Sequence, residues 1–277
     1  MGINKYMDNN IIQLENVSKY FNTSKGIFSK GEPFAALNNI SLNIKSGSSL
    51  GIVGESGSGK TTIARIVCDI YKADNGRVIY SGKEINSMTK EEYADYRKNV
   101  QMVFQDPNNT LNPKLKIYSA LSDGIKRHIT KDKQEIDNHL KNLMEMVGLP
   151  CDYLDRYPHE FSGGQRQRIS IARALSINPK VIIADEPVSS LDVSVQAQIL
   201  NLMKSLQKSG ITLILISHSL AVVSNMCENI AVMYKGRMVE YGSTDKVLSE
   251  PSSEYTKNLL KASSYTLLNR NEMELVK

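Results

Sequence analysis

The 277-residue sequence contains no tryptophan, only three cysteines and no apolar run long enough to span a bilayer. Cys68, Cys151 and Cys227 are far apart and form neither a C-x-x-C pair nor a metal-ligand spacing, so we expect reduced, structural thiols. The longest apolar runs, such as 211–216, are too short for a transmembrane helix, and residues 1–10 lack a signal-peptide core. These absences predict a cytoplasmic protein.

The chain also lacks any block of like charge. Its net charge of +5 is spread along the sequence, which is typical of a solvated surface and argues against a nucleic-acid-binding tail. With 41% hydrophobic and 23% charged residues, the chain is long enough for a substantial core. We expect one α/β unit with an inserted subdomain.

The segment 54–62, GESGSGKTT, fits the phosphate-binding pattern G-x-x-x-x-G-K-[ST] at every fixed position. Residues 50–53 before it predict a short buried strand. Apolar residues after it recur at i, i+3, i+4 and i+7, the spacing of one helix face, at Ile63, Ile66, Val67 and Ile70. Strand, glycine loop and helix are the context that the motif requires.

This loop predicts a triphosphate site. Glycines allow consecutive N–H groups to converge on an anion, and the helix N-terminus adds partial positive charge. Lys60 would reach the β- and γ-phosphates, the Thr61 hydroxyl would bind a bridging Mg²⁺, and Thr62 would contact the α-phosphate. The alternative is a glycine-rich turn without a ligand. The residues of the loop are Gly54, Glu55, Ser56, Gly57, Ser58, Gly59, Lys60, Thr61 and Thr62.

Before the phosphate loop, the sequence predicts strands over 11–17 and 37–44, which are joined by a connecting loop over 22–33. Tyr20 and Phe21 follow the first strand, where an aromatic ring can stack on a nucleotide base; a surface or core aromatic is the other interpretation. After the loop, strands are expected over 76–82 and 100–104. Gln105 ends the latter, at the strand end where ligands collect in α/β sheets.

A mostly helical insertion is expected over 106–169, and it ends in a second glycine-containing turn. Ser162, Gly163 and Gly164 precede a helix, with Ser162 as the expected cap. Such a turn is a candidate anion site, although a capping turn alone would explain it.

Acidic and basic side chains follow the next two predicted strands. Residues 181–184 form a continuous apolar run that ends in Asp185 and Glu186, and paired carboxylates favour a bound Mg²⁺. His218 follows the apolar run 211–216, beside the expected phosphates. Residues 230–234 and 238–241 predict a hairpin.

Over residues 11–250 the order of these motifs resembles the nucleotide-binding subunit of an ATP-binding-cassette (ABC) transporter. The resemblance implies a RecA-like P-loop ATPase core with an antiparallel β subdomain and an inserted α-helical subdomain. It matches 54–61 to Walker A, Gln105 to the Q-loop, 161–165 to the signature LSGGQ, and 181–186 to Walker B with its catalytic glutamate. Segment 190–192 resembles the D-loop, His218 the switch histidine, and Phe21, with Tyr20 as neighbour, the adenine-stacking aromatic. Phe161 replaces the usual signature Leu.

The resemblance implies four segments: 1–105 with the β subdomain and Walker A, 106–169 with the signature, 170–250 with the rest of the core, and a C-terminal extension, 251–277. The residues around the signature, 157–168, and those after Gln105, 106–107 and 111–113, resemble the oligopeptide, dipeptide and nickel importer branch. In the extension, the branch's usual His-Pro-Tyr-Thr reads Ser253-Glu254-Tyr255-Thr256. No Cys follows Cys227, which excludes the iron–sulfur cluster of some members.

The resemblance also implies a mechanism that uses ATP and Mg²⁺. Glu186 would polarise the attacking water, His218 would hold the γ-phosphate, and Thr61, Gln105 and Asp185 would surround Mg²⁺, with Gln105 also signalling to the helical subdomain. The opposite subunit of a dimer would cover the γ-phosphate with its signature and D-loop, here Ser162, Gly163, Gly164, Gln165 and Asp192.

The implied partners are a sister ATPase or a second copy of this chain, two permease subunits and an extracytoplasmic solute-binding protein, with no nucleic acid. The chain would then lie at the cytoplasmic side of the cell membrane. Two alternatives stay open, an exporter ATPase and a soluble nucleotide switch. A GTPase is disfavoured because the sequence lacks N-K-x-D.

Overall fold

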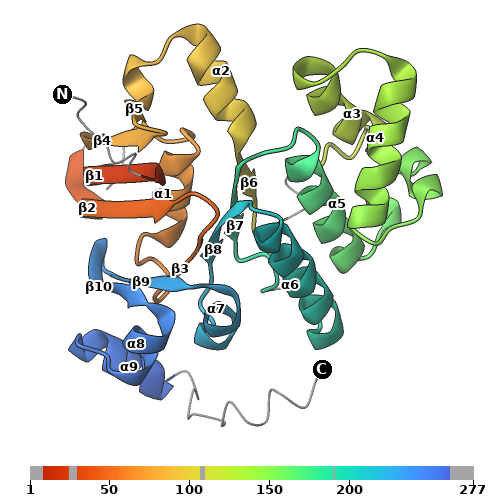
Figure 1. Ribbon diagram of the computed structural model, residues 1–277. Helices are drawn as coiled ribbons and strands as arrows, with labels where there is room; N and C mark the ends of the chain where they lie inside the picture. The colour runs from red at the N-terminus through yellow and green to blue at the C-terminus, as the bar shows by residue number, and fades with distance from the viewer. Residues whose placement is uncertain (1–8, 25–29, 107–109, 190, 263–277) are drawn as a thin grey trace, which may run out of the picture.

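The computed structural model describes residues 9–24, 30–106, 110–189 and 191–262, which form two β-sheets flanked by helices (Figure 1). Ser190, predicted above as part of the D-loop, lies outside the described residues. Within these ranges, no helix is both long and apolar enough to cross a bilayer.

The first sheet is antiparallel, with strand order β2-β1-β4-β5. Its strands are β1 Asn10–Ser24, β2 Lys30–Lys45, β4 Asn75–Tyr80 and β5 Lys83–Glu84. The predicted loop over 22–33 is wrong at both ends, because the β1–β2 ladder continues through Ser24 and resumes at Lys30. Cross-strand pairing overrides composition here, as is usual for strands. The longer hairpin places Phe21 directly opposite Phe34.

The second sheet has strand order β10-β9-β3-β8-β7-β6. Its strands are β3 Ser49–Val53, β6 Val100–Val103, β7 Val181–Asp185, β8 Thr212–Ile216, β9 Asn229–Tyr234 and β10 Arg237–Ser243. All neighbouring pairs are parallel except β9–β10, the predicted hairpin. Since parallel strands end at the same edge, Gly54, Gln105, Glu186 and His218 gather there.

Helices cover both faces of this sheet and form a separate group at one side. The α-helices are α1 Lys60–Val67, α2 Lys90–Asn99, α3 Ile117–His128, α4 Lys133–Met146, α5 Gly163–Leu175, α6 Val193–Lys208, α7 Leu220–Met226, α8 Thr244–Ser249 and α9 Glu254–Ala262. Short 3-10 turns are η1 Ile85–Ser87, η3 Cys151–Asp155 and η4 Pro158–Glu160. Helices α3, α4 and α5 pack together, away from the antiparallel sheet (Figure 1). Helix α5 continues across residue 169, where the sequence analysis placed the boundary between the segments 106–169 and 170–250. The four segment boundaries stay predictions.

Helix α1 is shorter than the apolar spacing predicts. It ends at Val67, and Asp69 then takes a left-handed conformation with φ of 53°. Ile70 therefore lies outside the helix and is 44% exposed, so its assignment to that helix face is wrong. The turn is held by Asp69 N–H donating to the Ile66 carbonyl at 2.9 Å, a local bond that the periodicity does not reveal.

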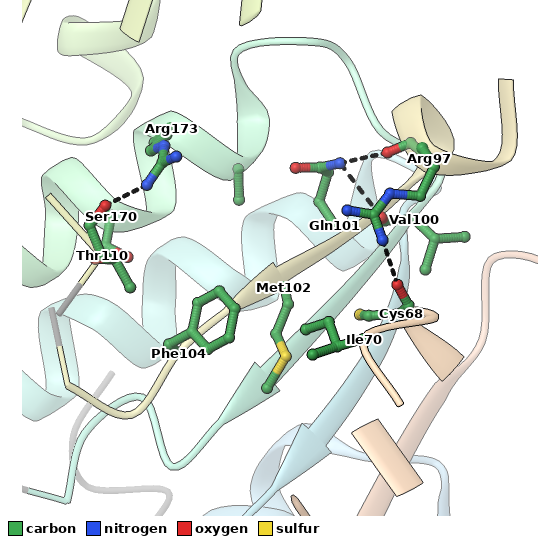
Figure 2. A pocket seen from close by; sticks show the side chains of 11 residues that line it. Cys68, Ile70, Arg97, Val100, Gln101, Met102, Phe104, Thr110, Ser170 and Arg173 are labelled. Atoms are coloured by element: carbon green, nitrogen blue, oxygen red, sulfur yellow. Dashed lines mark hydrogen bonds between the residues drawn. The ribbon is translucent and has the colours of Figure 1, made fainter. Parts of the chain in front are cut away.

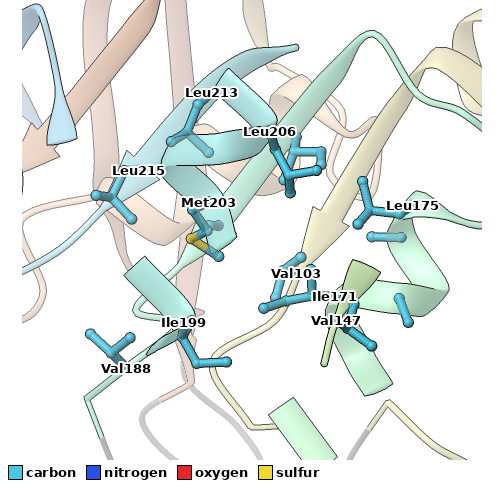
Figure 3. Packing of buried hydrophobic residues seen from close by; sticks show 14 of the residues in the cluster. Val103, Val147, Ile171, Leu175, Val188, Ile199, Met203, Leu206, Leu213 and Leu215 are labelled. Carbon is cyan, nitrogen blue, oxygen red and sulfur yellow. The ribbon is translucent and has the colours of Figure 1, made fainter. Parts of the chain in front are cut away.

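Alternate residues of the central strands enter two hydrophobic clusters, one on each face of the parallel sheet. In β7, Ile182 joins one cluster and Val181 the other. Figure 3 shows Leu213 of β8 near Met203 of α6 in the first cluster. Helix α7 packs so closely on β3 that a Cβ at Gly51 would lie 2.1 Å from Val223 Cγ1. This packing fixes the strand ends that carry the site.

Candidate nucleotide site

The phosphate loop depends on glycine at positions where a side chain would not fit. Gly54 and Gly59 have φ of 148° and 106°, a region that favours glycine. A Cβ at Gly54 would lie 2.2 Å from the Met233 carbonyl oxygen, and one at Gly59 would lie 2.6 Å from that of Ala36. The loop is therefore wedged between β9 and β2, with its backbone held in one conformation.

Lys60 begins α1 and folds back over the loop. Its ammonium donates to the carbonyl oxygens of Gly54 and Glu55, both at 2.8 Å. Burial lowers the pKa of Lys60, and the nearby carboxylates of Glu186, Asp185 and Glu55 oppose this shift. The cation thus lies inside the loop, close to where an anion would bind. Ser58 Oγ is buried with no hydrogen-bond partner among the described residues, and Ser58 does not line the cavity described below.

A carboxylate and a hydroxyl meet where β7 ends beside α1. Asp185 is 3% exposed, and Thr61 Oγ1 donates to Asp185 Oδ1 at 3.2 Å. Burial raises the pKa of Asp185; the Thr61 hydrogen bond opposes this shift and the adjacent Glu186 charge strengthens it. A buried carboxylate costs free energy unless a cation compensates it. Because Mg²⁺ prefers oxygen ligands, this pair fits a magnesium ion.

Glu186 brings together two other predicted residues. Gln105 Nε2 donates to Glu186 Oε2 at 3.1 Å, and His218 Nδ1 lies 3.4 Å from the same oxygen. The Glu186 backbone has φ of 46°, which costs a non-glycine residue about 1–2 kcal/mol. The Glu186 N–H donates to the Ile216 carbonyl at 3.0 Å, which ties the residue to the end of β8.

These residues line one cavity of about 470 Å³ with the phosphate loop. The lining residues are Phe21, Phe34, Ala36, Ser56, Gly57, Gly59, Lys60, Thr61, Thr62, Gln105, Glu186 and His218. Thus Walker A, Q-loop, Walker B and switch residues, more than 150 positions apart at the extremes, share one space. Tyr20 does not line it, and its backbone N–H donates to Asp74 Oδ2 at 2.6 Å.

Phe34 is a lining residue that sequence reasoning missed. It is 53% exposed and pairs across the hairpin with Phe21, whose ring packs edge-on against Tyr71 at a centroid distance of 5.5 Å. Two rings therefore flank the mouth of the cavity. The available signal was an aromatic on each side of the hairpin connection, which pairing brings together.

The signature residues lie elsewhere, at the start of α5. Ser162 caps that helix as predicted: its Oγ accepts from the Gln165 N–H at 3.3 Å, and Gln165 Oε1 accepts from the Ser162 N–H at 3.0 Å. A Cβ at Gly164 would lie 2.4 Å from Val195 Cγ1, so α5 starts against α6. Asp192 caps α6, and the Val195 N–H bond lowers the pKa of Asp192. Among the described residues, none of these lines the nucleotide cavity.

A second cavity, of about 210 Å³, lies between β6 and α5 (Figure 2). Its apolar side includes Ile70, Met102 and Phe104, and Phe104 directly precedes Gln105. Across it, Arg173 of α5 donates to the Thr110 carbonyl. This cavity, the groove between β6 and α5, thus joins the helical group to the strand that leads to Gln105.

Comparison with known proteins agrees with this arrangement. Residues 37–189 match the family model described as ABC transporter. The chain is 45% identical over 254 residues to the oligopeptide transport ATP-binding protein OppF of Streptococcus mutans, covering 91% of this chain and 81% of that protein. It is 43% identical over 256 residues to the dipeptide transport ATP-binding protein DppF of Lactococcus lactis, covering 90% and 80%.

Solved structures give the same fold. A dimeric post-hydrolysis state of the ATP-binding cassette MJ0796, bound to ADP and Pi, has 30% identity and a TM-score of 0.74, covering 84% of this chain and 98% of that one. CbiO1 from Clostridium perfringens, part of the ABC transporter complex cbiONQ, has 29% identity and a TM-score of 0.74, covering 97% and 100%. The predicted fold class is confirmed.

Proposed function

We propose that this chain, which belongs to the ABC transporter family, is the ATP-hydrolysing subunit that powers uptake of oligopeptides or dipeptides through separate permease subunits. The ATPase activity follows from the family. The shared cavity of phosphate loop, Glu186, Gln105 and His218 is the observation that best supports it. The peptide assignment is supported by relatives named for oligopeptide and dipeptide transport at 45% and 43% identity.

ATP binds along the cavity in this proposal. The triphosphate lies on the loop amides and the N-terminus of α1, where Lys60 reaches the β- and γ-phosphates. The adenine stacks between Phe21 and Phe34 at the mouth, since a π-face accepts any base. Tyr20 supports the strand through its backbone bond to Asp74.

Hydrolysis needs a group that polarises water beside the γ-phosphate. Glu186 is suited because its carboxyl group lines the cavity and is held by Gln105 and His218 at one oxygen. When ATP binds, His218 turns from Glu186 towards the γ-phosphate, and Gln105 signals phosphate occupancy to the helical group.

Thr61, Asp185 and Gln105 would hold a magnesium ion through their side-chain oxygens. When bound, that ion would supply positive charge that neutralises the phosphates. Asp185 is buried and already bonded to Thr61, so its carboxylate is oriented before a ligand arrives. This preorganisation avoids an ordering cost on binding.

The active site is completed by a second ATPase chain, either a sister subunit or another copy. Ser162, Gly163 and Gly164 form a capped helix start outside their own chain's cavity, and first-turn amides of a helix bind anions. Gln165 and Asp192 hold the starts of α5 and α6 in place. In a closed dimer this edge covers the partner's γ-phosphate.

The permease subunits dock in the groove between β6 and α5 (Figure 2). Its apolar side chains suit a helix end, and Phe104 joins the groove to Gln105 through one peptide bond. The permease contact and the nucleotide site are therefore connected through adjacent residues. In this arrangement the chain lies at the cytoplasmic face of the membrane, and an extracytoplasmic binding protein delivers the peptide.

The test is uptake of labelled di- to pentapeptides in a strain lacking this gene. The wild-type gene should restore uptake and Lys60→Ala should not, with both proteins present at equal levels. Labelled nickel serves as the control solute. Normal peptide uptake in the deletion strain, combined with lost nickel uptake, would replace the peptide assignment with a metal importer.

A further inference from the structure

The C-terminal extension contacts the phosphate loop directly. Tyr255 of α9 accepts, through its hydroxyl oxygen, a hydrogen bond from the Glu55 backbone N–H at 3.1 Å, across 200 positions of sequence. Figure 1 shows α9 beside β10, the edge strand of the six-stranded sheet from which the phosphate loop extends. The contact joins a segment outside residues 37–189, which match the ABC transporter family model, to the phosphate loop.

The Tyr255 ring has a fixed platform. It packs on Tyr234, at the end of β9, with ring centroids 4.2 Å apart and planes inclined by 31°. Two residues later, the Gly236 N–H donates to the Ser58 carbonyl at 3.0 Å. The β9–β10 turn and Tyr255 therefore hold two points of the same loop.

The segment before Tyr255 is anchored by one carboxylate. Glu240 of β10 accepts from Ser252 N–H at 2.7 Å, Ser252 Oγ at 2.9 Å and Ser253 N–H at 3.1 Å. Although burial opposes ionisation, the nearby Thr256 hydroxyl and then the Ser252 and Ser253 hydrogen bonds lower the pKa of Glu240. The anchor is therefore charged at neutral pH, and it sets where α9 begins.

The bonded peptide unit explains why this contact matters. The Glu55 N–H and the Gly54 carbonyl belong to one planar peptide group. Tyr255 holds its N–H, and Lys60 Nζ donates to its carbonyl at 2.8 Å. Rotation of this plane would displace the carbonyl that positions the Lys60 ammonium.

We propose that Tyr255 is a positioning residue of the ATP site, which acts by fixing the Gly54–Glu55 peptide plane and so the lysine that binds the β- and γ-phosphates. Burial raises the pKa of Tyr255, so its hydroxyl stays neutral and adds no negative charge near the triphosphate. The extension thereby sets nucleotide affinity in this chain. This inference rests on the proposed function of Lys60.

The test compares Tyr255→Phe with wild type in the assembled transporter. Phenylalanine keeps the ring on Tyr234 and removes only the acceptor. Loss of one neutral hydrogen bond should raise the Kd for Mg-ATP, and the KM, by roughly two- to tenfold. The kcat at saturating ATP should stay unchanged. The Glu55 amide should exchange with deuterium faster. Tyr241→Phe, on exposed β10 surface, is the matched control and should behave as wild type.

Glu240→Gln tests the anchor separately. The amide has one acceptor oxygen in place of two, so α9 loosens and Kd should rise in the same direction. If both changes act through the Tyr255 contact, the double variant should be no worse than Tyr255→Phe alone.

Three results would overturn the inference. Unchanged Kd and unchanged Glu55 exchange in Tyr255→Phe, with wild type binding normally, would refute it and leave the proposed function intact. A fall in kcat at unchanged KM would assign Tyr255 a different role. Failure of wild type itself to bind Mg-ATP would refute the proposed function and this inference together.

Discussion

Replacing Glu186 by glutamine isolates the chemical step from nucleotide binding. The change keeps the side-chain shape and an oxygen for the Gln105 amide, which donates to Glu186 Oε2 at 3.1 Å. It removes the charge that polarises water. Losing a general base slows a reaction about 10²- to 10⁴-fold, or roughly 3 to 5 kcal/mol in the barrier. We expect kcat for ATP hydrolysis to fall by that factor.

Binding should survive the same change. The Glu186 carboxylate raises the pKa of Lys60 against the larger effect of burial, which means that its charge partly compensates the ammonium. Without it, Lys60 has more uncompensated charge for the triphosphate. The backbone strain at φ of 46° is also unchanged, because glutamine has the same branching at Cβ. We therefore expect Mg-ATP affinity equal to or tighter than wild type.

The assay measures phosphate release and Mg-ATP binding in the reconstituted complex. Glu91→Gln, an exposed position in the first turn of α2, is the control and should leave both unchanged. A Glu186→Gln complex that turns over within threefold of wild type would refute the assignment of Glu186. So would a tenfold loss of affinity, because it would place Glu186 among the binding groups.

Three further changes test the rest of the site. Lys60→Ala should weaken Mg-ATP binding about 10- to 100-fold, the cost of hydrogen bonds to a charged group, with calorimetric titration as the measurement. Phe34→Ala should weaken it about two- to tenfold through lost stacking, while Tyr241→Ala on exposed β10 should not. Ser162→Arg should abolish labelled-ATP crosslinking to the partner ATPase and preserve crosslinking to its own chain. The conservative Ser162→Asn keeps a capping side chain and should retain both.

Local patterns were sufficient for the parts of the site that one segment determines. Residues 181–185 form β7 because the apolar run 181–184 suits a buried parallel strand. The glycine loop has positive φ angles that only glycine adopts readily. Ser162 caps α5 because Gln165 lies three positions later, which completes a capping box. Each of these depends on neighbours within a few residues.

Contacts between distant segments were not predictable in the same way. Phe34 lines the cavity because the β1–β2 register places it opposite Phe21, and the composition of 22–33 does not encode that register. Ile70 leaves its helix because of the turn at Asp69. Tyr255 reaches Glu55 only after α9 has folded onto the sheet. In each case tertiary packing decided between local alternatives of similar free energy.

The same division supports the proposal that the site of this chain is completed by a partner. Its cavity is lined by the loop, Glu186 and two aromatic rings, all positioned by strands of one sheet and its neighbouring hairpin. The start of α5 is fixed by a different constraint, the close contact of Gly164 with Val195 of α6, which keeps Ser162 outside that cavity. No change of side-chain rotamer brings a helix N-terminus across the domain. If the Ser162 edge acts on ATP, it acts on ATP bound to another chain, and the loss of the partner's crosslink in Ser162→Arg is the direct consequence.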